Sequence, residues 1–171
     1  MLSNKLQDLI NEQINKEFYS AYLYLAYSNY CEDLGLDGFA NWYEIQANEE
    51  CDHAFLFRKF LLDNGAKVKF EGIEKPSYTL NSTYDLLEGG LKHEKYVTKL
   101  ITNIYNVAFE EKDFKTMQFL DGFLKEQIEE EKNAEDLLKK MSLFGNDSKG
   151  LYLLNQELGQ RTYVSEVSNE M

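Results

Sequence analysis

A set of polar residues recurs at one fixed offset along this chain, and each member lies within an apolar segment of helical periodicity. Each of three residues has a counterpart 77 positions later, in the pairs Glu17 and Glu94, Glu50 and Gln127, and His53 and Glu130. Polar residues on an inward helix face need partners, because burying them alone is costly. The repeat therefore predicts one site built from four helices.

The first half of the chain contains two segments in which apolar residues recur at steps of three or four. We expect the first helix to start near Asn4 behind a Ser3 cap and to end at Gly35. The second helix is expected to start with Asp37 as its cap and to end at Asn64-Gly65. Together they predict a helical hairpin.

The second half repeats this pattern. A Ser82 or Thr83 cap is expected to start a third helix, and the short acidic connection 110–113 leads to a fourth that ends at Gly145. Residues 66–82 between the hairpins are irregular and long enough to run the length of a bundle. Such a crossover makes the two hairpins antiparallel around one axis.

The expected fold is all-α. It is a four-helix bundle over about 4–143, with a long crossover between the second and third helices and a short C-terminal fifth helix at about 148–159. We expect a single domain over 1–171, with a polar, frayed tail at 160–171. The fifth helix is amphipathic, so it packs either on its own bundle or between subunits.

Helix geometry predicts that the polar residues meet at one depth. Glu17 lies 18 residues before Gly35, whereas Glu50 and His53 lie 15 and 18 residues after it. At ~1.5 Å per residue, all three lie ~25 Å from the turn. Glu94 and the later pair have the same spacing about the second turn. Both polar layers are therefore expected at mid-bundle.

Four carboxylates and one imidazole face inward, and the inward stripes carry no Lys or Arg to neutralise them. Two divalent cations would neutralise four negative charges. Oxygen ligands with one imidazole and open positions suit iron, whereas structural zinc prefers Cys or His in a closed shell. The alternative is a buried polar layer that fixes the register of the helices. The double pattern favours the metal site.

Composition narrows the classes of partner. The net charge of −12 disfavours nucleic acid and anionic membranes, which repel an acidic protein, and it suits cations, although it also serves solubility. Two cysteines are too few for a disulfide framework. The chain shows no leader pattern and no apolar run of spanning length. We therefore expect a soluble, cytoplasmic protein.

Several dispersed motifs resemble those of non-haem bacterial ferritins over roughly residues 1–160. They are NEQINKE (11–17), NEECDHA (48–54), HE (93–94), KEQIEEEK (125–132) and GLYL (150–153). The resemblance implies a ferritin-like bundle that acts as a ferroxidase, oxidising Fe(II) with O2 or H2O2. It also implies a homo-oligomer of 24 subunits, a hollow shell in which ferric oxyhydroxide is stored.

The resemblance also implies roles for particular residues. Glu17, Glu50 and His53 match the ligands of a first iron. Glu50, as a bridge, matches a ligand of a second iron together with Glu94 and Glu130. Gln127 stands where the family has a polar residue near the metal pair.

Three further carboxylates, Glu49, Glu126 and Glu129, match a third iron site that shares Glu130. Without the resemblance they would read as a solvated acidic face. Tyr24 matches a tyrosine beside the metals that can donate a hydrogen bond or an electron, and ordinary core packing is its alternative. His93 is rotated by about 100° from the inward stripe and is interpreted as a surface or packing residue.

The sequence differs from bacterioferritins at two places, and one of them argues against a bound haem. Residue 52 is Asp where bacterioferritins place a haem-binding methionine, so we expect no haem. The fourth helix has Gln127-Ile128-Glu129-Glu130 where bacterioferritins have a second Glu-x-x-His motif. Two other functions stay open: an acidic bundle that binds cations passively, and a di-iron oxygenase, which would need an apolar substrate pocket beside the metals.

Overall fold

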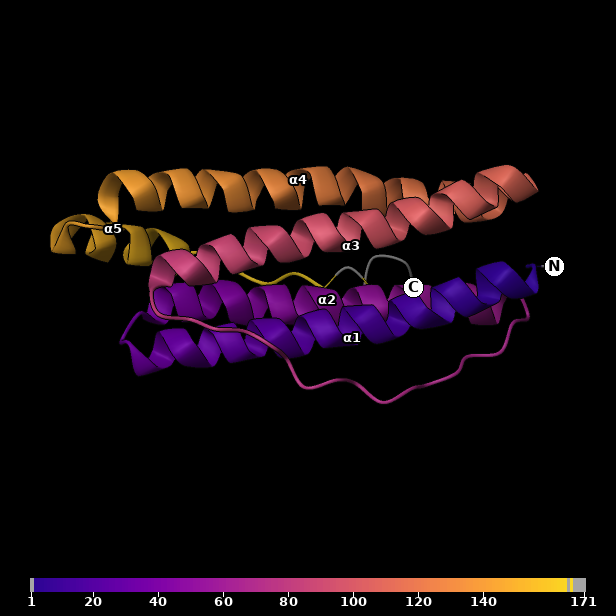
Figure 1. Cartoon of the computed structure of the whole chain (residues 1–171), viewed down its shortest axis with the longest axis horizontal. Helices are drawn as coiled ribbons and strands as arrows, with labels where there is room; N and C mark the ends of the chain where they lie inside the picture. Colours follow the sequence, from indigo (N-terminus) through magenta and orange to yellow (C-terminus); the bar gives the residue numbers. More distant parts are fainter. Residues whose placement is uncertain (1, 166, 168–171) are drawn as a thin grey trace.

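The computed structural model describes residues 2–165 and 167. Within them the chain forms five α-helices and no strand: α1 (Asn4–Asp33), α2 (Asp37–Asp63), α3 (Thr83–Glu111), α4 (Phe114–Phe144) and α5 (Ser148–Leu158). The four long helices lie side by side with their axes roughly aligned (Figure 1). This confirms the predicted all-α bundle with a short fifth helix.

Two hairpins make up the bundle. α1 packs on α2 and α3 packs on α4, while α1 and α3 join the two hairpins. The irregular segment 64–82 connects α2 to α3 and runs the length of the bundle (Figure 1). Among the described residues, no helix combines the length and apolar character needed to cross a bilayer.

Side chains of α1 hold the crossover in place. The Asn11 amide donates to the backbone oxygen of Lys67 (3.1 Å) and accepts from the backbone N–H of Lys69 (2.6 Å). One turn along, Asn15 donates to the backbone oxygen of Gly72 (3.2 Å). These bonds satisfy backbone groups that no strand or helix pairs. The crossover is therefore part of the bundle's packing.

Most helix ends follow the expected chemistry. Ser3 Oγ accepts from the Leu6 N–H and Ser82 Oγ from the Asp85 N–H, both at 3.1 Å, so both are N-caps. The connection between α3 and α4 is shorter than predicted, because α3 continues through Glu111. Lys112 then adopts a left-handed conformation (φ 58°), and Asp113 caps α4.

The prediction that Asp37 caps α2 was wrong. The Leu36 carbonyl accepts the first intrahelical bond, from the Ala40 N–H, so Asp37 already lies in the first turn. The free N–H groups of Gly38 and Phe39 instead donate to Asn155 Oδ1 of α5, at 2.9 and 3.2 Å. A distant helix thus supplies the cap.

α5 packs on its own bundle, against α2 and α4. Its Leu154 and Leu158 are buried in the core cluster at this end. Contact with α2 is close: a Cβ on Gly38 would lie 1.7 Å from the backbone oxygen of Asn155. Only glycine fits there. Gly122 on α4, in contrast, is exposed with open space around it, and nothing in the structure explains it.

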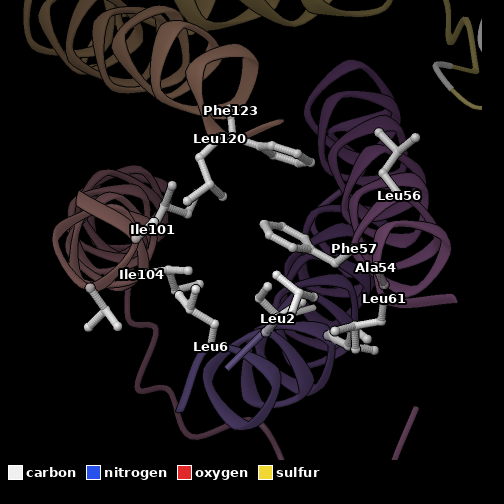
Figure 2. Close-up of a cluster of buried hydrophobic side chains, with 14 of the residues drawn as sticks. Leu2, Leu6, Ala54, Leu56, Phe57, Leu61, Ile101, Ile104, Leu120 and Phe123 are labelled. Atoms are coloured by element: carbon white, nitrogen blue, oxygen red, sulfur yellow. The ribbon is translucent and has the colours of Figure 1, made fainter. Parts of the chain in front are cut away.

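Within the described part of the chain, the core consists of two hydrophobic clusters. One combines the start of α1 with the end of α2 and includes Leu6, Phe57, Ile101 and Phe123, whose side chains converge between the four helices (Figure 2). The other lies toward the opposite end and includes Phe39. On every helix the predicted polar residues lie between the positions that contribute to the two clusters. The polar layer therefore lies at mid-bundle, as predicted.

Candidate metal centre

Glu17, Glu50 and His53 come together in the middle of the bundle. Glu17 is fully buried on α1, and the other two are 4% and 6% exposed on α2. One ligand atom from each lies within 4.8 Å of the other two, and among the described residues this is the one group of three or more His, Cys, Asp or Glu side chains so arranged. Such a group can surround one cation.

Two carboxylate oxygens in this group make no hydrogen bond of ordinary length among the described residues. They are Oε2 of Glu17 and Oε2 of Glu50. The other oxygen of Glu17, Oε1, accepts from the Gln13 amide at 2.8 Å. Buried carboxylate oxygens are rarely left without a partner, because their desolvation is costly. Hard anionic oxygens beside an imidazole nitrogen suit a divalent cation such as iron, so the residues fit the metal that the sequence predicts.

His53 carries the local counter-charge. Its Nδ1 lies 3.6 Å from Glu50 Oε2, and its Nε2 lies 3.2 Å from Glu126 Oε1. Burial alone lowers the pKa of a histidine, but hydrogen bonds and charge from Glu126 and Glu50 raise the pKa of His53 well above 6.5. A cation that binds Nδ1 or Nε2 must displace a proton.

Burial also shifts the carboxyl groups. Desolvation raises the pKa of Glu17 and, more strongly, that of Glu50, where the neighbouring Glu17 and Glu94 add to the shift. Desolvation together with the Glu130 charge raises the pKa of Glu94 to about 7. Without a cation, these groups therefore hold protons that free glutamates would lose.

The second half of the predicted site is held by polar neighbours. Tyr24 OH donates to Glu94 Oε1, and the Gln127 amide donates to Glu94 Oε2 (3.1 Å) and to its backbone oxygen (3.3 Å). Thr98 Oγ1, which accepts a third bond from Gln127 (3.2 Å), donates to Glu131 (2.7 Å). Tyr24 and Gln127 thus orient the Glu94 carboxylate.

Glu130 faces α2 across the bundle. Its Oε2 accepts a hydrogen bond from the Gln46 amide at 2.9 Å. It is more exposed than Glu94, and desolvation raises its pKa. Glu94 and Glu130 interact electrostatically but do not form a close triad with Glu50.

The three carboxylates of the expected third site do not form a cluster. Glu49 is paired with Arg161, whose Nη2 donates to both of its carboxylate oxygens at 2.9 and 2.7 Å. Glu126 contacts His53, and Glu129 is exposed on α4. Each has a different environment, and the guanidinium at Glu49 stands where a cation was expected.

Tyr24 and His93 belong to an aromatic layer beside the polar residues. The rings of Tyr24 and His93 meet edge to face, with centroids 5.6 Å apart, and Tyr24 also contacts Tyr27 and Tyr43. His93 Nε2 lies 2.8 Å from Ser20 Oγ, and burial lowers its pKa to about 4. His93 is a packing residue, one of the two roles that the sequence allowed.

Two glutamines were missed as site residues. Gln13 bonds Glu17 on its own helix, and Gln46 bonds Glu130. Each lies four residues before a predicted ligand, Glu17 and Glu50, so it shares the ligand's helix face. This four-residue spacing is the sequence signal that could have identified the two glutamines as neighbours of the ligands. Arg161 had no such signal, because it lies beyond the last helix.

Known proteins are similar to this chain in sequence and in fold. The family model described as "Ferritin-like domain" matches residues 7–144. The bacterial non-heme ferritin of Staphylococcus aureus (strain USA300) is 36% identical over 166 residues, which cover 97% of this chain and all of the relative. That of Staphylococcus saprophyticus is 38% identical over 163 residues, covering 95% of this chain and 98% of the relative.

Solved structures agree. The open pore ferritin from the archaeon Archaeoglobus fulgidus has a TM-score of 0.92 at 40% identity, covering 95% of this chain and all of its own. A humanized archaeal ferritin has a TM-score of 0.94 at 38% identity, covering 96% and 99%. The family match, the full-length identity and the placement of the buried carboxylates agree. This chain belongs to the ferritin family of iron-storage proteins.

Proposed function

We propose that this protein stores iron by oxidising Fe(II) at the mid-bundle centre and depositing ferric oxyhydroxide inside a hollow oligomer. The observation that carries the proposal is the buried group Glu17, Glu50 and His53, with two carboxylate oxygens that make no hydrogen bond of ordinary length among the described residues. Iron is the substrate and the cargo. Glu94 and Glu130 would complete the position of a second ion.

The reaction balances with either oxidant. Two Fe(II) ions lose one electron each, and one O2 with two protons becomes H2O2, or one H2O2 with two protons becomes two waters. The protein holds the two ions together, which turns two one-electron losses into a single two-electron event. The protons that the acidic side chains release as Fe(II) binds lie next to the reacting atoms.

Side chains around the ligands fix their geometry. Gln13 holds Glu17, Gln127 holds Glu94, and Gln46 holds Glu130. Such bonds orient a carboxylate before the metal arrives. Tyr24 donates to Glu94, and its buried phenol keeps its proton because burial and the Glu94 charge raise its pKa well above 10. Tyr24 is therefore proposed as a hydrogen-bond donor that steadies the second ion's ligand.

The size of the neighbouring cavity disfavours the oxygenase alternative. The cavity bordered by Glu94, Glu130 and Tyr24 measures ≈ 20 Å³. That is room for about one water molecule and too little for an organic substrate. The centre thus suits small oxidants.

An anaerobic Fe(II) titration tests the two-ion site and separates it from passive binding. We expect saturation at about two ions per subunit before any mineral forms, because a two-metal centre fills first. Passive binding by the acidic surface would give a gradual isotherm without a plateau. It would also weaken strongly between 50 and 500 mM salt, since exposed charges are screened.

The shell is proposed to contain 24 subunits, and the cytoplasm is the proposed compartment, in which both cysteines stay free thiols. Exposed apolar side chains on α5, such as Tyr152 (61%) and Leu153 (58%), support assembly, because isolated subunits rarely expose such residues together. Light scattering should give a particle of about 24 times the subunit mass. A stable monomer or dimer would reject the shell.

A further inference from the structure

The segment that follows α5 turns back along α2 toward the metal centre. In Figure 1 it leaves α5 as a yellow trace and runs beside α2. Asn41 of α2 fixes it, donating to the backbone oxygens of Leu158 (3.3 Å) and Arg161 (3.1 Å). Further along, Tyr163 OH donates to Asp52 Oδ2 at 2.7 Å. Arg161 and Tyr163 are therefore held by hydrogen bonds to α2, whereas a frayed tail was expected at 160–171. Residues 166 and 168–171 lie outside the described part.

This segment places a guanidinium on the carboxylates beside the centre. Arg161 Nη2 donates to both oxygens of Glu49, and Nη1 donates to Gln46 Oε1. Gln46 in turn donates to Glu130, so Arg161 orients the amide that holds a predicted iron ligand. The guanidinium carbon lies 4.2 Å from the centroid of the Trp42 ring.

These contacts hold Arg161 firmly. The Arg161 and Glu49 side chains are only 19% and 21% exposed, so solvent screens the pair less than a surface ion pair. The Trp42 face adds a cation–π contact. A planar guanidinium that binds a carboxylate and an aromatic ring together cannot be replaced by lysine with the same geometry.

A cation and this guanidinium compete for Glu49. Both oxygens of Glu49 already accept from Arg161 within 2.9 Å. A divalent ion at the same oxygens would meet a positive charge at contact distance, in a partly buried place where the repulsion is strong. We propose that Arg161 closes the third cation position at Glu49, so that each subunit holds two tightly bound ions. This deepens the proposed function, because it determines how many cations the site takes.

Equilibrium binding of Co(II), measured without O2, tests whether Arg161 closes the third cation position. It does so without measuring catalysis. We expect about two tight sites per subunit for the wild type and one additional, weaker site for Arg161→Gln, because Glu49 is then open while Glu126 and Glu129 do not gather around it. Arg161→Lys retains the charge and should stay near two. Arg58→Gln removes the only other arginine, which is exposed on α2, and serves as the matched control at two.

The double variant Arg161→Gln/Glu49→Gln should lose the extra ion, because the carboxylate that holds it is gone. The inference is overturned if Arg161→Gln binds no more Co(II) than the wild type, or if the extra ion persists in the double variant. If the two-ion stage is missing in every variant while the Arg161-dependent ion is still gained, the proposed oxidation site fails and the role of Arg161 stands.

Discussion

Replacing Glu50 with alanine is expected to lower the initial rate of Fe(II) oxidation by at least about 100-fold. Removing an outer partner of a metal ligand already costs about 10- to 100-fold, and Glu50 is proposed to touch both ions. It is 4% exposed, and its Oε2 makes no hydrogen bond of ordinary length among the described residues. Stopped-flow absorbance of the ferric product under O2 measures the effect.

Two further variants make this result specific. Glu50→Gln keeps the shape of the side chain but cannot bind a cation as a carboxylate does, so we expect a similar loss of rate. Glu44→Ala removes an exposed carboxylate from the same helix and should leave the rate within about twofold. A Glu50→Ala rate close to that of the wild type would remove Glu50 from the centre.

The metal-free protein is expected to lose stability as the pH rises from 6.5 to 8. The Glu50–His53 pair retains a proton in the fold, because the pKa of both groups is raised. In the unfolded chain, glutamate is already deprotonated at pH 6.5, and histidine, with a pKa of about 6.5, loses its proton as the pH rises toward 8. A group whose folded pKa is raised stabilises the fold fully below its unfolded pKa and loses that contribution as pH rises through the folded pKa. Each retained proton lowers the unfolding free energy by about 1.4 kcal/mol per pH unit.

Protonated Glu94 also stabilises the fold, and this contribution is lost as the pH rises from 4.5, its ordinary pKa, to its folded pKa of about 7. His93 acts oppositely below pH 6.5, because burial lowers its pKa to about 4, so the clearest window lies above 6.5. Urea unfolding at several pH values measures the slope. Saturating Co(II) should reverse it, since cations bind the deprotonated ligands. A metal-free protein whose stability is level or rises over this window would contradict the assigned electrostatics.

Local periodicity was enough to predict the bundle. Helix starts at Ser3 and Ser82 and the depth of the polar layer follow from capping and from the rise per residue, which depend on nearby residues only. The cap of α2 could not be predicted in this way. It comes from Asn155, more than a hundred residues away, and a local rule gave Asp37 instead.

Part of the candidate metal centre could also be predicted from local pattern, whereas its surroundings could not. Glu17, Glu50 and His53 converge because their helices bring equal depths together. The neighbourhood of Glu49 was not predictable, since it depends on where an irregular tail places one arginine. The inward stripes carry no basic residue, and no helical pattern indicates that one arrives from outside the helices. Tertiary contacts of irregular segments leave no periodic signal.

Anomalous scattering from crystals soaked anaerobically with Fe(II) tests the central claim most directly. We expect two iron peaks per subunit at mid-bundle. One should lie between Glu17, Glu50 and His53, and the other should be bound by Glu50, Glu94 and Glu130. The paired arrangement should persist at substoichiometric iron. Iron found only on the exposed acidic surface, with Glu50 and His53 still in contact with each other and no metal between the helices, would contradict it.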